Sequence, residues 1–352
     1  MAREEHSVDT RFRWDVGLAG PVFLDYGFAS LDAAPQEGTE VFAGTAGISP
    51  GGIATLAVAG ARLGLRTALA APFGTDAFSA WCWSVLQDQE GVDLSASRRL
   101  AELPMPVTVA IADGGDRSMI TYAPGLDDAV RAIGAAPEAR TVIADLKTLD
   151  PAAADPWWRR AAAAGTQLFV DIGWDSTERW RQEDLAPLES CHAFTPNERE
   201  AMAYTRTDDP VSAARALAER VPLVVVTRGG DGVVAIDAAS GAEVVVPALP
   251  VRVLDPTGAG DVFAAALVRA GLLGLPLADQ AAFAVLASGI AVTRRGSALS
   301  APGWADIARW WQNVRGSDDE ELRTRYGFLD DAIPTGPHPD HPSAPESLPS
   351  PR

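Results

Sequence analysis

The chain has 352 residues, 47% of them hydrophobic and 22% charged, which is typical of a globular protein with a large core. Its formal net charge of −18 argues against nucleic acid or an anionic membrane as a partner, because both attract a basic face. Two cysteines (Cys82 and Cys191) and four histidines argue against a disulfide framework and a histidine metal site. The charged start "MAREEHSVDTRFRW" has no signal-peptide core and the apolar stretches are too short for a bilayer, so we expect a cytoplasmic protein.

The N-terminal third predicts a small β-sheet of its own. In chain order we expect a strand over 15–20, a short strand near 39–43, a helix over 52–63 and a β-hairpin over 106–123. These strands do not alternate with helices in the simple order of a parallel sheet. We therefore expect them to pair with each other as a small β lid, built from about 18–50 and 104–124.

From residue 141 onward, apolar strands alternate with helices. Strands are expected over 141–146, 167–173, 192–197 and 222–230, helices over 155–165, 198–204, 212–220, 261–273 and 278–293, and a hairpin over 232–250. Strands that are apolar on both faces indicate a mostly parallel sheet with helices on both sides, in one domain over 14–312. The tail, 316–352, is rich in Pro, Ser and Asp, and we expect it to be largely disordered.

The stretch "DPTGAGD" (255–261) predicts an anion site. Gly258 and Gly260 bracket a turn at the start of an apolar helix, where unpaired backbone N–H groups attract phosphate. Asp261 would repel that phosphate, which makes sense if its carboxylate takes the proton of a hydroxyl that attacks phosphorus. From these residues alone, an N-cap role for Asp261 is an equally good interpretation.

Further motifs follow in a fixed order, and together they resemble those of the PfkB (ribokinase-like) family. They are the pair Gly51-Gly52 before a helix ending "ARLGL", the Asn-x-x-Glu of "TPNERE", the stretch "VVVTRGGDGVV", the "DPTGAGD" turn and "TRRGS" (293–297). The resemblance covers about 14–312. It implies an α/β fold, a doubly wound mostly parallel sheet flanked by helices with a small β lid. It also implies transfer of the ATP γ-phosphoryl group to a hydroxyl of a small unphosphorylated sugar or sugar derivative.

The resemblance also implies roles for individual residues. Asp261 would be the general base, and the N–H groups of Gly258, Ala259 and Gly260 would form an anion hole. The acceptor would contact Asp25, Gly51, Gly52 and Thr55. The nucleotide would contact Asn197, Glu200, Thr227, Arg228, Gly229 and Gly232, with Glu200 holding Mg²⁺ through water. A K⁺ ion would be held by Asp255, Ala291, Arg294, Gly296 and Ser300.

Simpler interpretations stand beside these roles. Asp255 and Arg294 could form an ion pair with no K⁺ present, and Asn197 with Glu200 could be a capped helix start. Asp25 could be a turn residue, and Arg228 a solvated side chain.

The acceptor end of the chain departs from the family pattern. Thr55, Gly173 and Val285 stand where relatives often carry asparagine. The sequence therefore determines the identity of the substrate less well than the type of reaction. The alternatives are a nucleoside kinase and a non-catalytic sensor that binds a sugar or nucleotide. No G-x-G-x-x-G follows the first strand, which argues against a dinucleotide-dependent oxidoreductase. We also expect a homodimer through the β lid as one arrangement.

Overall fold

The computed structural model describes residues 11–113, 116–151, 153–172 and 178–341. Within these residues, no helix is both long enough and apolar enough to cross a membrane. Gly173, one of the departures from the family pattern, lies outside the described residues.

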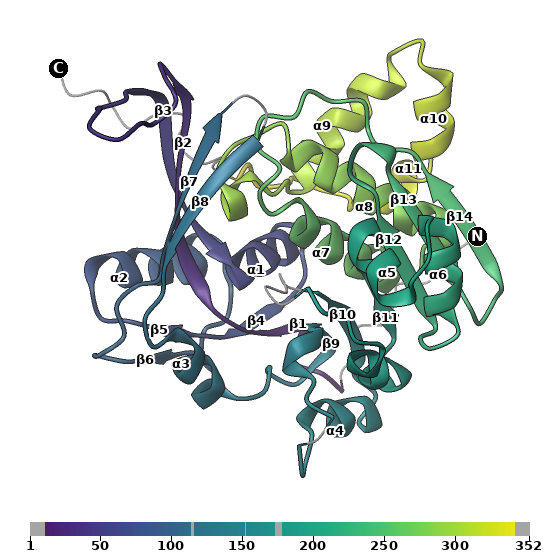
Figure 1. Cartoon of the computed structure of the whole chain (residues 1–352). Coiled ribbons are helices and arrows are strands. Elements are labelled where there is room, and N and C mark those ends of the chain that lie inside the picture. Colours follow the sequence, from purple (N-terminus) through teal and green to yellow (C-terminus); the bar gives the residue numbers. More distant parts are fainter. Residues whose placement is uncertain (1–10, 114–115, 152, 173–177, 342–352) are drawn as a thin grey trace.

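The centre of the molecule is a sheet of eight strands within the described chain (Figure 1). Its strands are β1 Trp14–Ala19, β4 Thr67–Ala70, β9 Ala139–Asp145, β10 Gln167–Asp171, β11 Ala193–Phe194, β12 Leu223–Thr227, β13 Val233–Asp237 and β14 Ala242–Val246. They lie in the order β14-β13-β12-β11-β10-β9-β1-β4. The six strands from β12 to β4 run parallel, and the β13–β14 hairpin adds two antiparallel strands at one edge. The predicted mostly parallel α/β sheet is confirmed.

Alternate side chains of the main strands enter two cores on opposite faces of the sheet. In β12, Val224 and Val226 belong to one core, whereas Val225 belongs to the other. Helices cover both faces because each strand is apolar on both sides. One core contains α1 Ile53–Arg62, α7 Ala259–Leu272, α8 Leu277–Ala291 and α9 Trp304–Arg315; the other contains α4 Trp157–Ala163, α5 Glu198–Thr205 and α6 Pro210–Ala218.

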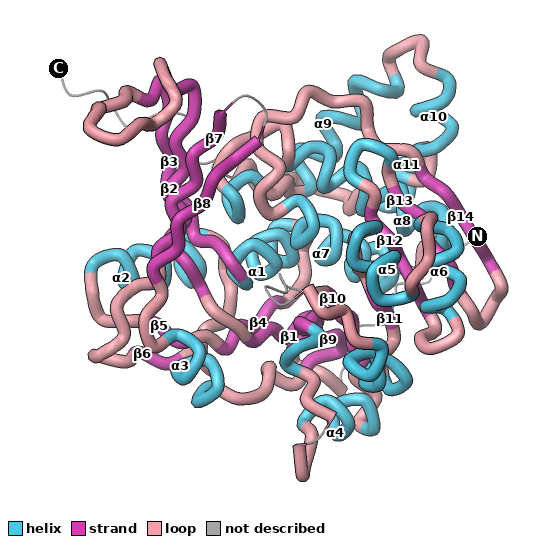
Figure 2. Tube along the Cα trace, viewed as in Figure 1, coloured by secondary structure: helices cyan, strands magenta, loops and turns pink. Residues whose placement is uncertain are grey.

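Four strands form a second sheet, the lid, which stands apart from the main sheet (Figure 2). They are β2 Val22–Leu31, β3 Ala43–Gly52, β7 Val107–Asp113 and β8 Asp116–Tyr122, in the order β3-β2-β7-β8. The predicted β lid is thus confirmed. The short strand expected near 39–43 instead runs from Ala43 to Gly52, directly into α1. Near the lid lie α2 Ala77–Ser84, α3 Leu126–Ile133, β5 Pro72–Phe73 and β6 Arg98–Arg99 (Figure 1).

The tail differs from its prediction. Residues 320–332 form two further helices, α10 Glu320–Tyr326 and α11 Leu329–Ala332. Tyr326 and Leu329 are fully buried, and the Tyr326 ring packs edge-on against Trp310 of α9 with ring centroids 4.9 Å apart. Leu322, Tyr326 and Leu329 recur at helical spacing, and composition averaged over the whole tail hides this short apolar stripe. The expectation of disorder is wrong for 320–332, and residues 342–352 lie outside the described part.

Because of this packing, Tyr326→Ala should destabilise the protein substantially. Removal of a buried aromatic side chain typically costs about 3–5 kcal/mol of unfolding free energy, through lost burial and the cavity that is left. Denaturant unfolding of the full chain measures the change. Arg323→Ala, an exposed position of the same helix, is the matched control. Equal stability of the two variants would contradict the docking of the tail.

Candidate active site

The site centres on the glycine turn that starts α7. Gly258 is the N-cap residue, with φ of 78° in the left-handed region, and it makes no side-chain cap. Asp255 fixes the turn, since its Oδ1 accepts a hydrogen bond from the Thr257 N–H at 2.9 Å. The Ala259 N–H donates to the Pro256 carbonyl at 3.2 Å, while the N–H groups of Gly258 and Gly260 donate to no other described residue. Two of the three predicted anion-hole donors are therefore available at the positive end of a 14-residue helix.

Asp261 is the third residue of α7, not its cap, so the N-cap interpretation does not hold. Burial, together with the negative charge of Asp25, raises the pKa of Asp261 to about 7. A carboxyl group with a pKa near neutrality is suited to accept a proton and release it again. The charge of Asp25, in the lid, thus acts on Asp261, in the core.

Asp25 lies within lid strand β2, so it is a strand residue and not the turn residue considered above. Its carboxylate rests on the backbone of Gly51 in the neighbouring strand β3. A Cβ atom at position 51 would lie only 2.0 Å from Asp25 Oδ2, so glycine is required for this close approach. Gly52 follows and is the N-cap residue of α1. The predicted acceptor residues Asp25, Gly51 and Gly52 are thus together at the root of the lid.

Thr55, the fourth predicted acceptor residue, lies elsewhere. It is 1% exposed, and its Oγ1 is 3.2 Å from Ser297 Oγ, in the loop before α9. Its methyl group faces the glycine turn, because a Cβ atom at Gly258 would lie 2.7 Å from Thr55 Cγ2. This placement does not support a direct contact with the acceptor.

Carboxylates gather where the parallel strands end. Asp145 ends β9, Asp171 ends β10, and Glu200 lies in the first turn of α5 after β11. Burial raises the pKa of Asp171 well above its usual value, and the charges of Asp261, Glu200 and Asp145 raise it further. In α/β sheets, ligands bind at this carboxyl edge. Neither Asp145 nor Asp171 was among the predicted site residues, although their position at the ends of buried strands is a visible signal.

Asn197 and Glu200 form a capping box at the start of α5. The Asn197 side chain accepts from the Glu200 N–H at 3.0 Å, and Glu200 Oε2 accepts from the Asn197 N–H at 2.9 Å. The simpler interpretation of these residues is therefore correct as local structure. The capping box uses Oε2 of the Glu200 carboxylate and not Oε1. The pKa of Glu200 is raised, because the effect of burial outweighs the hydrogen bonds with Asn197, which lower it. Within the described residues, no group of three His, Cys, Asp or Glu side chains could hold a metal ion by itself.

The remaining predicted nucleotide residues follow β12. Thr227 and Asn197 form an isolated parallel β-bridge, which places the end of β12 beside the start of α5. The Arg228 guanidinium donates to the Asp231 carbonyl at 2.7 Å and so folds over the short turn η4 Gly229–Asp231. Gly232 closes this turn, where its carbonyl accepts from the Arg228 N–H at 2.8 Å.

The predicted cation site lies behind the glycine turn. The N–H groups of Leu254 and Asp255 both donate to the Val292 carbonyl, at 2.8 and 3.2 Å, which ties Asp255 to the end of α8. Ala291 ends α8, and its carbonyl accepts from the Arg294 N–H at 3.0 Å. The Arg294 side chain pairs with Asp306 of α9 at 2.5 Å, so the guanidinium considered as a partner for Asp255 is engaged there. In the same loop, Gly296 directly precedes η5 Ser297–Ser300, and Ser300 is the last residue of η5.

Known proteins share this sequence and fold. Residues 28–304 match the model of the pfkB family of carbohydrate kinases. A nucleoside kinase of Methanothermobacter thermautotrophicus is 28% identical over 303 residues, which cover 84% of this chain and 94% of that protein.

Solved structures agree on the fold. A putative ribokinase II from E. coli in complex with ATP and Mg²⁺ has a TM-score of 0.69 at 21% identity, covering 85% of this chain and 99% of that one. Adenosine kinase from Sinorhizobium meliloti has a TM-score of 0.66 at 24% identity, covering 84% and 99%. The resemblance drawn from the sequence motifs is therefore confirmed: the chain belongs to the pfkB family of carbohydrate kinases and is a phosphotransferase that acts on a hydroxyl group.

Proposed function

We propose that this kinase transfers the γ-phosphoryl group of ATP to a hydroxyl of a small, unphosphorylated sugar or sugar derivative. The observation that supports the proposal is a carboxylate, Asp261, that directly follows the glycine turn in α7 and whose pKa is raised to about 7 by burial and by the charge of Asp25. The acceptor hydroxyl gives its proton to the Asp261 carboxylate while its oxygen attacks the γ-phosphorus. ADP leaves, and the N–H groups of Gly258 and Gly260 stabilise the charge on the transferred group.

Asp25 would accept hydrogen bonds from other hydroxyls of the acceptor and so fix its orientation. Gly51 and Gly52 have no side chains, which lets Asp25 and the Phe23 ring lie directly against the backbone where the lid joins α1. Positioning of this kind supplies much of the rate in phosphoryl transfer, because the chemistry needs little covalent help from the protein.

Mg²⁺ would accompany the nucleotide. Asp145, Asp171 and Glu200 crowd negative charge beside the expected phosphates, and a divalent cation would offset it. Since Mg²⁺ keeps several waters and needs few protein oxygens, water-mediated contact with Glu200 suits this arrangement. The E. coli neighbour in complex with ATP and Mg²⁺ supports Mg²⁺ as the cation that accompanies the nucleotide.

Glu200→Gln should raise the Mg²⁺ concentration needed for half-maximal turnover. Gln can still accept the hydrogen bond from the Asn197 N–H, so the capping box and the helix are kept while the charge is lost. A Mg²⁺ titration of the initial rate measures the shift. Glu198→Gln, in the same first turn of α5, is the control. Identical titrations for Glu200→Gln and the unmodified enzyme would remove Glu200 from the metal site.

A nucleoside is the second candidate acceptor, and the lid favours it in one respect. Gly27 pairs with Gly47 and with Ala110, one row beyond the Asp25 row on the same face of the lid. A Cβ atom at Gly27 or Gly47 would meet nothing within 4 Å. This row is therefore a flat surface without side chains at Gly27 and Gly47. It lies about 7 Å from Asp25, the distance between residues i and i+2 of a strand, so a planar base would fit there beside a bound ribose.

A screen of phosphoryl transfer from labelled ATP to sugars, sugar acids and nucleosides tests the proposal and separates the two acceptors. Turnover with a free sugar at least tenfold above that with any nucleoside supports the first candidate. The opposite preference, lost on Gly27→Val, supports the second. No transfer to any member of these classes would overturn both, and binding without turnover would identify a sensor.

We further propose a K⁺ ion beside the glycine turn, held by Asp255 and by oxygens of Ala291, Arg294, Gly296 and Ser300. The hydrogen bonds that tie Asp255 to Val292 support their proximity, and hard oxygen ligands suit this cation. Replacement of Na⁺ by K⁺ at constant ionic strength should raise turnover, and Asp255→Ala should abolish the response. Turnover that is indifferent to the cation would sink the proposal.

A further inference from the structure

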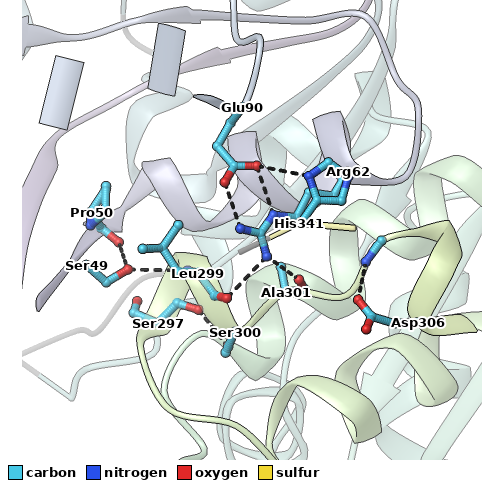
Figure 3. Close-up of polar contacts among 11 residues, drawn as sticks. Ser49, Pro50, Arg62, Glu90, Ser297, Leu299, Ser300, Ala301, Asp306 and His341 are labelled. Carbon is cyan, nitrogen blue, oxygen red and sulfur yellow. Dashed lines mark hydrogen bonds and ion pairs between the residues drawn. The ribbon is translucent and has the colours of Figure 1, made fainter. Parts of the chain in front are cut away.

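The short loop η5, Ser297–Ser300, is unusually well anchored for a connection between helices (Figure 3). All four of its residues are buried. The Arg62 guanidinium, at the end of α1, donates to the carbonyls of Leu299 and Ala301 at 3.1 and 2.7 Å. Arg62 is itself held by both carboxylate oxygens of Glu90, at 2.7 and 2.8 Å, and both side chains are at most 1% exposed. A paired, hydrogen-bonded charge of this kind fixes the loop in one place.

The lid holds the same loop from its other side. The Leu299 N–H donates to Ser49 Oγ at 3.3 Å, and the Ser49 hydroxyl donates to the Pro50 carbonyl at 2.9 Å, in lid strand β3 (Figure 3). Position 49 pairs with Asp25 across the lid strands. The loop thus lies between the root of the lid and the core, with fixed contacts to both.

Ser297 has a strained backbone. Its φ of 42° lies in the left-handed region, which glycine adopts freely and other residues adopt at a cost. Glycine would relieve this strain, and glycine already occupies the preceding position, Gly296. A non-glycine residue kept in a strained conformation is a signal that its side chain has a use.

The Ser297 side chain reaches the back of the glycine turn. Its hydroxyl lies 3.2 Å from Thr55 Oγ1, and both side chains are buried, at 4% and 1% exposure. The Thr55 methyl group packs on Gly258: a Cβ atom there would lie 2.7 Å from Thr55 Cγ2 and 3.7 Å from Ser297 Oγ. The hydroxyl pair therefore lies directly against the residue that starts α7.

We propose that Ser297 is a positioning residue for phosphoryl transfer: through Thr55 it holds the Gly258 turn where its N–H groups meet the transferred group. The inference rests on the proposed function, because it concerns the same anion hole. Ser297 contacts neither substrate. Its loss lets the turn move, and a displacement of about 1 Å in such a site can cost as much as 100-fold in rate.

Ser297→Gly is the decisive variant. It removes the hydroxyl and the backbone strain together, so the melting temperature should stay equal or rise, while kcat falls about tenfold. The KM values for ATP and for the acceptor should change by less than about twofold, because no substrate contact is lost. A residue that merely stabilised the fold would show a lower melting temperature instead.

Ser30→Gly is the matched control, since Ser30 also has a positive φ, of 56°, but is exposed on the lid. It should leave kcat unchanged. Two further variants each remove one hydroxyl of the pair. Thr55→Val keeps the methyl contact with Gly258, and Ser297→Ala keeps the rest of the side chain, so both should lower kcat to a similar extent. The double variant should lose no more than either single one, because both break one interaction.

Normal kcat in folded Ser297→Gly and Ser297→Ala would overturn the inference while leaving the kinase proposal intact. Additive losses in the double variant would also contradict it. If the unmodified protein transfers phosphate to no sugar or nucleoside, the proposed function fails first, and the inference falls with it.

Discussion

Asp261→Asn should lower kcat by about 10²–10⁴-fold, the usual contribution of a positioned general base. The amide is nearly the same size as the carboxylate but cannot take the proton of the acceptor hydroxyl. Affinity for the nucleotide should stay the same or rise, because a negative charge beside the phosphates is lost. Steady-state rates with the preferred acceptor measure the first effect, and titration with ATP analogues measures the second.

Asp279→Asn is the matched control for this variant. Asp279 is the third residue of α8, as Asp261 is of α7, so the same substitution is made at the same helical position outside the site. It should leave kcat within about twofold of the unmodified value, since surface substitutions rarely reach a distant site. Near-normal turnover in Asp261→Asn would remove Asp261 from the reaction.

The same residue sets an expected pH dependence. A base must be ionised, and the pKa of Asp261 is raised to about 7, so kcat/KM should fall as the pH drops through that value. The effect on stability runs in the opposite direction from the effect on activity. Because the pKa of Asp261 in the folded state lies above its unfolded value of 3.8, its contribution to the free energy of unfolding is present at low pH and is lost as the pH rises from about 4 to 7. Asp261→Asn should therefore melt at the same or a higher temperature than the unmodified protein at pH 8.

Local sequence patterns were sufficient for much of this site. The turn, the helix that follows it and the position of Asp261 all lie within "DPTGAGD" and the apolar spacing that follows it. The main sheet followed from strands that are apolar on both faces, which only a sheet covered by helices on both sides can bury. In each case the determining interactions lie within one helix or one strand.

Contacts between distant segments could not be predicted in this way. Thr55 and Ser297 are separated by 242 positions, and nothing in either segment shows that the two hydroxyls meet. The grouping of Asp171 with Glu200 and Asp261 depends on the order of strands in the sheet, which local patterns do not specify. The prediction for the tail was wrong for a related reason. Burial of the Tyr326 ring depends on contact with Trp310 of α9, and the composition of the tail alone does not show this contact.

Gly258→Ala should lower kcat by about 100-fold, because it disturbs the proposed anion hole in two ways. The φ of 78° is unfavourable for any residue with a Cβ atom. The added Cβ would also lie 2.7 Å from Thr55 Cγ2, closer than real Cβ contacts allow, so the turn or α1 must shift. A shift of a few tenths of an ångström to 1 Å misaligns donors whose value depends on fixed geometry.

Two further variants divide this effect between its causes. Thr55→Ser in the Gly258→Ala background removes the clashing methyl group and keeps the hydroxyl for Ser297, so it should restore kcat about tenfold if the clash dominates. Gly241→Ala is the control for backbone strain alone. Gly241 has a φ of 72° in the β13–β14 hairpin, where a Cβ atom would meet nothing within 4 Å. It should lower stability by about 1 kcal/mol and leave kcat unchanged. Full activity of Gly258→Ala would show that the start of α7 binds no part of the transferred phosphate.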